Sequence, residues 1–66
     1  MIIEAKFNVY YMADYGQANY QMKKQLNVDS NLAVGALKEL VRDTFTPEVV
    51  RDVPSARIRD VEIRII

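Results

Sequence analysis

Residues that commonly carry enzyme chemistry are scarce in this 66-residue sequence. It contains no Cys and no His, so thiolate nucleophiles, zinc sites built from Cys and His, and the commonest general base are all missing. Ser30 and Ser55 have no imidazole to activate them, and we expect a helix cap and a loop residue instead. The carboxylates form no obvious inward pair, and neither an EF-hand spacing nor a Gly-rich phosphate loop is present. We therefore predict a protein that is not an enzyme, with no catalytic residue, no metal and no cofactor.

Amides and tyrosines are the side chains best suited to specific recognition, and they gather in the first part of the chain. Six of the seven side-chain amides lie between Asn8 and Asn27, and all four tyrosines fall between Tyr10 and Tyr20. An amide both donates and accepts hydrogen bonds, so an amide-rich surface can bind the edge of a peptide or of a base. An exposed tyrosine is rigid and amphipathic, which makes it a frequent hot spot of protein interfaces. The alternative for both groups is an ordinary solvated surface.

Two alternating segments would position these side chains. The odd positions from Ile3 to Tyr11 are apolar, and the alternation resumes from Ala18 to Val28 with the even positions mostly apolar. Period two over this length indicates two half-buried strands, and residues 14–17 supply Asp and Gly for a turn. We predict a hairpin with a loop over 14–17 or the tighter 15–16. The expected pairs are Tyr11 with Tyr20, Val9 with Met22, and Ala5 with Leu26.

The next segment is predicted to be helical. Three good N-cap residues, Asp29, Ser30 and Asn31, precede residues 32–45, over which apolar residues recur with helical spacing. We expect this helix to end at Thr46, because a proline disfavours helical geometry in the residue before it, and Pro47 to begin a short second helical turn over 47–52. The expected apolar face holds Ala33, Ala36, Leu37, Leu40, Val41 and Thr44, with Val34 and Phe45 at its margin.

The last segment, residues 57–66, alternates again and indicates a third strand. Ile58 is out of phase with Val61 and Ile63, which predicts a β-bulge near Arg59–Asp60. Three strands and one main helix fit a single α+β domain over residues 1–66, a two-layer ββαβ sandwich. Since the helix returns the chain to the far side of the first strand, we expect the strand order 2-1-3, in an antiparallel or mixed sheet.

The sheet face turned away from the helix is the candidate binding surface. We predict that this face and the hairpin tip bind a protein partner, as an inhibitor or adaptor would. The alternative is weak binding of single-stranded nucleic acid or a nucleotide, with Tyr10 as a stacking platform among Lys6, Lys23 and Arg64. The predicted partner-binding residues are Lys6, Asn8, Tyr10, Tyr15, Gln21, Lys23 and Arg64.

The charge pattern favours a protein partner over nucleic acid or a membrane. Nine Lys and Arg balance nine Asp and Glu, so bulk attraction to nucleic acid or anionic lipid is absent. Arg57, Arg59 and Arg64 alternate with Asp60 and Glu62 and do not form the clustered basic stripe of a nucleic-acid footprint. No apolar run is long enough to span a membrane, and the first residues do not resemble a signal peptide. With cysteine also absent, we expect a cytoplasmic protein.

The two outer strands of the predicted sheet differ in how their edges are protected. Lys24 interrupts the apolar side of the second strand, where we expect it opposite Phe7. An inward lysine on an edge strand discourages edge-to-edge association, and the alternative is a cation held for an anionic ligand or a partner carboxylate. The third strand has no such residue, so we predict a homodimer through this strand, with Glu62 near Arg64 of the second copy. The predicted interface comprises Val61, Glu62, Ile63, Arg64 and Ile65.

Two known families resemble the chain in general features. Residues 2–45, a hairpin followed by a helix, are similar in pattern to ubiquitin-like β-grasp domains. A conjugated modifier of that kind needs a flexible Gly-Gly tail, whereas this sequence ends in a strand at Ile66, so we do not expect that role. Tautomerases resemble the chain in length and α+β character and act through a proline exposed after removal of the initiator Met. Ile2 stands at that position, so we expect no tautomerase activity.

Overall fold

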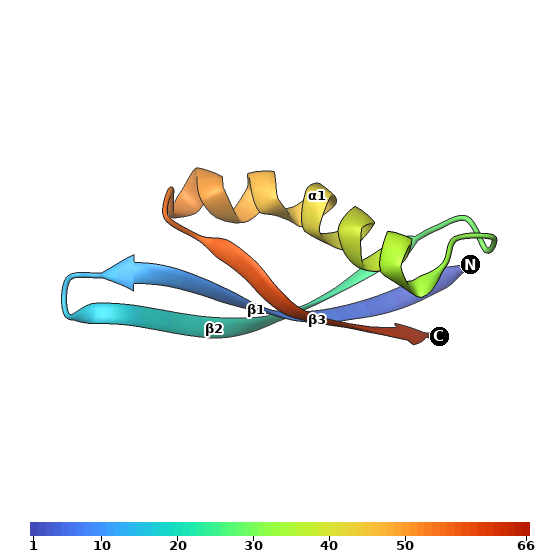
Figure 1. Cartoon of the computed structure of the whole chain (residues 1–66), viewed down its shortest axis with the longest axis horizontal. Coiled ribbons are helices and arrows are strands. Elements are labelled where there is room, and N and C mark those ends of the chain that lie inside the picture. The colour runs from blue at the N-terminus through green and yellow to red at the C-terminus, as the bar shows by residue number, and fades with distance from the viewer.

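The computed structural model describes all 66 residues as three strands and one helix (Figure 1). β1 lies in the centre of the sheet and pairs antiparallel with both neighbours, which gives the order β2-β1-β3. The α+β class and the strand order are therefore confirmed, and the third strand is antiparallel to the first. The molecule is elongated, 42 × 17 × 17 Å, with both chain ends at one end of its long axis. The elements are β1 (Ile2–Ala13), β2 (Gly16–Asn27), α1 (Val34–Asp52) and β3 (Arg57–Ile65).

The predicted pairing within the hairpin is wrong by two residues, although the predicted faces are right. The loop consists of Asp14 and Tyr15 alone, a two-residue connection of the commonest hairpin kind. Gly16 follows with φ +126°, a conformation that favours glycine. A shift by two residues leaves every side chain on its own face, so alternation could not separate the two registers. The rings of Tyr11 and Tyr20 still meet diagonally, with centroids 5.9 Å apart. The observed pairs include Tyr11 with Ala18, Val9 with Tyr20, Phe7 with Met22, and Ala5 with Lys24.

α1 is one continuous helix that passes through Pro47, so the predicted end at Thr46 and the separate second turn are wrong. Pro47 cannot donate the N–H that Asp43 would otherwise receive, which weakens the helix locally. The apolar stripe nevertheless continues beyond it, because Val49 is buried in the same core as Val41. Packing on the sheet therefore overrides the local tendency of proline to end the helix.

The start of α1 also differs from the prediction. Asp29 accepts the backbone N–H of Asn31 through its Oδ1 atom at 2.9 Å, so it closes a turn of its own and does not cap the helix. The N-cap is Ala33, which makes no side-chain capping bond. The first three helical residues, which include Val34 and Ala36, are exposed, and Thr44 is exposed as well. The face that reaches the core is narrower than expected, and its buried residues are Leu37, Val41 and Val49.

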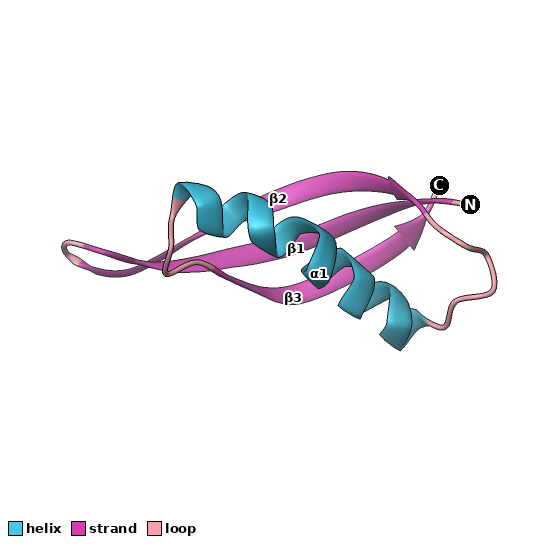
Figure 2. Cartoon of the chain, turned by 90° about the horizontal axis from the view of Figure 1, so that it is seen from above, coloured by secondary structure: helices cyan, strands magenta, loops and turns pink.

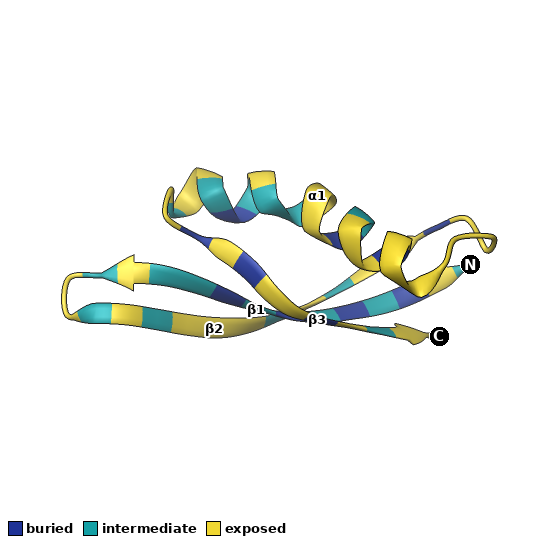
Figure 3. Cartoon of the chain, viewed as in Figure 1, coloured by how far each residue is buried: buried dark blue, intermediate teal, exposed yellow.

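α1 crosses one face of the sheet diagonally (Figure 2). The ring of Phe45 stacks on Phe7 of β1 with centroids 5.7 Å apart, and Glu48 reaches Lys24 of β2. Eleven residues are buried between helix and sheet, all of them apolar (Figure 3). A core of this size supplies no more than roughly 3–5 kcal/mol of stability. Its members are Ile3, Ala5, Phe7, Val9, Val28, Leu37, Val41, Val49, Ala56, Ile58 and Val61.

The predicted bulge in the third strand is confirmed. The β1–β3 register shifts between Lys6 and Asn8, and Asp60 takes φ 57°, in the left-handed region that Asp tolerates better than most residues. The extra residue brings Ile58 and Val61 onto the same face, and both are buried. It also turns the Asp60 carboxylate toward the opposite face of the sheet, where it contacts Asn8.

Candidate functional site

The sheet face opposite α1, called the open face below, has no element packed on it (Figure 1). Strand alternation places on it the even residues of β1 and the odd residues of β2. Residues of β3 that pair with the even residues of β1 share this face. Its apolar members are Ile2 and Met12, at the two ends of β1. The other members are polar: Glu4, Lys6, Asn8 and Tyr10 of β1, Gln17, Asn19, Gln21, Lys23, Gln25 and Asn27 of β2, and Arg57, Arg59, Asp60, Glu62 and Arg64 of β3.

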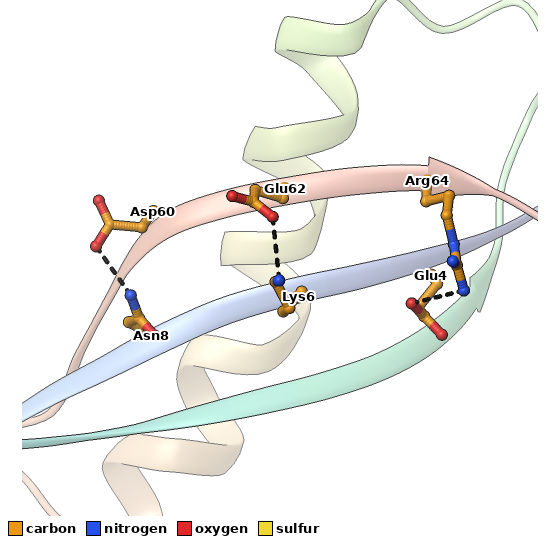
Figure 4. Close-up of polar contacts among 6 residues, drawn as sticks. All are labelled: Glu4, Lys6, Asn8, Asp60, Glu62 and Arg64. Carbon is orange, nitrogen blue, oxygen red and sulfur yellow. Dashed lines mark hydrogen bonds and ion pairs between the residues drawn. The ribbon is translucent and has the colours of Figure 1, made fainter.

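Polar contacts join β1 to β3 across the open face (Figure 4). An Nη atom of Arg64 lies 3.1 Å from a carboxylate oxygen of Glu4, and Lys6 Nζ lies 3.4 Å from Glu62. These exposed ion pairs each contribute about 0–1 kcal/mol, so their main effect is to orient the side chains.

Asp60 orients two further side chains of β1. Asn8 Nδ2 donates to Asp60 Oδ2 at 3.0 Å, and the Tyr10 hydroxyl donates to the same oxygen at 3.3 Å. From the sequence, Asp60 was expected only near a bulge and among the acids that alternate with the arginines of the third strand. The signal that could have revealed its role is the bulge itself, because such irregularities redirect side chains.

The structure brings six of the seven predicted partner-binding residues onto the open face. Gln21 lies opposite Asn8, and Lys23 lies opposite Lys6. Tyr10 and Arg64 belong to the contacts described above. Tyr15 is separate from this group: it occupies the hairpin tip, where 83% of its surface is exposed.

A shallow pocket of about 230 Å³ opens at one part of this face. Lys6 and Lys23 face each other there across β1 and β2, and such like-charge neighbours repel. Lys6 is paired with Glu62, whereas Lys23 has no carboxylate within ion-pair distance. Lys23 is therefore the cation of this pocket that remains available to an external anion. The lining residues are Glu4, Lys6, Lys23, Glu62, Ile63 and Arg64.

The open face carries an excess of positive charge that sequence order concealed. Five basic side chains stand there against three carboxylates, while the whole chain is neutral, so the rest of the molecule carries the compensating acids. Arg57 and Arg59 pair with Tyr10 and Asn8 in the β-ladder and make no ion pair. These two arginines were missed as site residues because the sequence places them near Asp60 and Glu62. In the structure, Asp60 bonds to Asn8 and Tyr10, and Glu62 pairs with Lys6.

Lys24 is held by the protein's own helix. It lies opposite Ala5, not opposite Phe7 as predicted, and its Nζ is 3.3 Å from Glu48 Oε1 of α1. The side chain is 34% exposed, consistent with an aliphatic stem along the core and a charged end near solvent. Glu48 of the same chain therefore supplies the carboxylate partner of Lys24.

The residues of the predicted dimer interface lie along the outer edge of the sheet. Ile66 donates its N–H to the Ile2 carbonyl at 3.1 Å, so alternation directs the backbone groups of Ile63 and Ile65 away from β1. Val61 also directs its backbone outward, but its side chain is buried under α1. Ile63 is half-buried and Ile65 exposed. Glu62 and Arg64 point to the open face, in the ion pairs described above.

No known family model, curated protein or solved structure matches this chain. No group of three or more acidic side chains comes close enough together to hold a metal ion. The helix of the structure does not combine the length and apolar character that crossing a membrane requires.

Proposed function

We propose that the protein is a non-catalytic interaction module, of the inhibitor or adaptor type, that acts in the cytoplasm by binding a partner protein through its open face. The observation that carries this proposal is an uncovered sheet face on which Asp60 holds both Asn8 and Tyr10. Side chains that are already oriented lose less conformational freedom on binding, which favours affinity. The unpaired Lys23, Arg57 and Arg59 favour a partner whose surface is acidic.

Loss of Tyr10, which is half-buried on the open face, and of the exposed Tyr15 tests this proposal. Tyr10→Ala and Tyr15→Ala are each expected to weaken capture of the native partner by more than about 1 kcal/mol, roughly fivefold in affinity, because both remove rigid amphipathic contacts. Capture from an extract of the native host measures the effect, with circular dichroism to verify that each variant is folded. Lys38→Ala, on the exposed side of α1, is the matched control. Undiminished capture by both tyrosine variants would show that the partner binds elsewhere, and loss with Lys38→Ala would indicate the helix.

Single-stranded nucleic acid is the second candidate ligand. Arg57 and Arg59 beside Tyr10 support it, since bases stack on tyrosine and phosphates attract free arginines. Against it, Lys6 and Arg64 are already neutralised by Glu62 and Glu4. Nucleic-acid affinity would fall steeply with rising salt, so a titration at two ionic strengths separates the two candidates.

We also propose that two copies associate through β3. With Ile63 on the two-fold axis, the outward backbone groups of Ile63 and Ile65 can bond to the second copy, and Glu62 comes opposite Arg64 of that copy. The small core supports the proposal, because a domain with eleven buried residues gains from covering Ile65, which is 66% exposed.

The mass in solution is expected to be twice 7.6 kDa at high micromolar concentration. Light scattering coupled to size exclusion measures it, and a monomer would refute the association. Ile63→Pro removes an outward N–H, and Glu62→Arg places like charges opposite each other, so both should weaken the dimer. A dimer that tolerates both changes must use another surface.

A further inference from the structure

The outer edge of β2 presents a regular row of backbone groups. Val28 donates its N–H to the Met1 carbonyl at 2.8 Å, and the Met1 amine donates to the Val28 carbonyl at 3.1 Å, so these residues form a hydrogen-bonded pair. Such pairs alternate along an antiparallel ladder. The even residues of β2 therefore bond to β1, and the odd residues direct their N–H and C=O groups away from the sheet. These odd residues are Gln17, Asn19, Gln21, Lys23, Gln25 and Asn27.

β2 lacks most of the features that usually protect an edge strand. Its register with β1 runs without a shift over all 12 residues, and it contains no proline. β3, in contrast, is interrupted by the bulge at Asp60. The inward Lys24 is neutralised by Glu48. α1 lies above one face of the sheet and out of the plane of the strands (Figure 1). The edge of β2 is therefore a long template on which another strand can pair.

The charges of β2 define which strand would fit. The strand contains two lysines and no carboxylate. Lys23 faces Lys6 and has no ion-pair partner, and it lines the pocket of the open face. An added strand would place the side chain that pairs with Lys23 on the open face, because paired residues share a face. A carboxylate at that position would offset the repulsion between Lys23 and Lys6.

We propose that the edge of β2 binds an extended acidic segment of a partner protein, which joins the sheet as a fourth strand with an Asp or Glu opposite Lys23. This rests on the proposed interaction function and names the form of the partner. The main-chain bonds supply affinity, and Lys23, flanked by Gln21 and Gln25, supplies the preference for acid.

A second copy of this chain is a poor occupant of the same edge. A two-fold pairing over the full length of β2 would bring Lys23 of both copies, neither with an ion-pair partner of its own, close together near the middle of the joint. No carboxylate on the strand could compensate them. Self-association at this edge is therefore opposed by charge, whereas an acidic strand is favoured.

Titration of the whole protein with a ten-residue peptide of alternating Thr and Glu tests the proposal, with alternating Thr and Lys as the matched probe. We expect saturable NMR shifts and slower amide exchange at the odd residues of β2 with the acidic peptide, and at least tenfold weaker binding of the basic one.

Gln21→Pro removes an outward N–H and no bond to β1, so it should weaken binding at least tenfold. Gln21→Ala removes the side chain but keeps that N–H, so it should retain most of the binding that Gln21→Pro loses. Lys23→Gln should weaken binding about fivefold.

Three outcomes would overturn the edge site: no shift at the odd β2 amides with millimolar acidic peptide, equal binding of the basic peptide, or equal binding by Gln21→Pro and Gln21→Ala. Asn19→Pro serves as the second proline variant if Gln21→Pro does not fold. The first two outcomes are measured on the wild-type protein and do not depend on any variant. The Tyr10→Ala protein in the same titration separates the two proposals. If Tyr10→Ala still binds the acidic peptide, the edge site is supported, whatever the result for partner capture through the open face. If Tyr10→Ala loses partner capture while the wild type does not bind the acidic peptide, the open face is supported and the edge site is not.

Discussion

Phe7→Ala is expected to lower the free energy of unfolding by about 3–5 kcal/mol, close to the whole stability of a domain of this size. Phe7 lies on the central strand, 1% exposed, with its ring stacked on Phe45 of the helix. Truncation leaves a cavity where helix, hairpin and third strand meet. Urea unfolding followed by circular dichroism measures the loss.

Met12→Ala is the matched control for this experiment, since Met12 lies on the same strand with 63% of its surface exposed. It should change stability by less than about 0.5 kcal/mol. A Phe7→Ala protein that melts cooperatively at the wild-type temperature would show that the core is not built around this ring.

Val49→Asp is expected to unfold the protein, with a loss of more than about 4 kcal/mol. Val49 is 2% exposed and follows Pro47, so an aspartate there would be an unpaired charge in the core. The same change at Val34, which is 62% exposed at the start of α1, places an acid in the first helical turn and should cost almost nothing.

Far-ultraviolet circular dichroism and thermal melting distinguish the two variants. If Val49→Asp were as stable as Val34→Asp, α1 would have to leave the sheet at Pro47, as sequence alone suggests. The comparison therefore tests whether α1 stays on the sheet after Pro47, which local sequence signals do not predict.

The strands were predictable because alternation depends only on which side of the sheet each residue faces. In the same alternation Ile58 is out of phase with Val61 and Ile63, which predicted the bulge found at Asp60. Loop length was not predictable in this way, because two registers two residues apart bury the same side chains. The helix was predicted too short because the rule for Pro47 is local, whereas the burial of Val49 depends on a sheet distant in sequence.

The candidate site was predictable as a face but not as a set of contacts. Strand parity placed Lys6, Asn8 and Tyr10 together, and the structure confirms that placement. The role of Asp60 depends on its left-handed backbone, which sequence marks only as an irregularity. Lys24 pairs with Glu48 because α1 continues past Pro47 on its diagonal path. A helix predicted to end at Thr46 could not reveal this ion pair.

The central position of β1 has a consequence for the order of folding. β1 meets β2 across a two-residue loop, but its other partner lies some fifty residues further along the chain. A hairpin closes in microseconds, whereas synthesis at about 5–20 residues per second delivers β3 seconds later. During that interval the side of β1 that will receive β3 is an open edge in a half-built sheet. Glu4 and Lys6 lie along that edge, and charged side chains on an open edge disfavour pairing with another chain until Arg64 and Glu62 are in place.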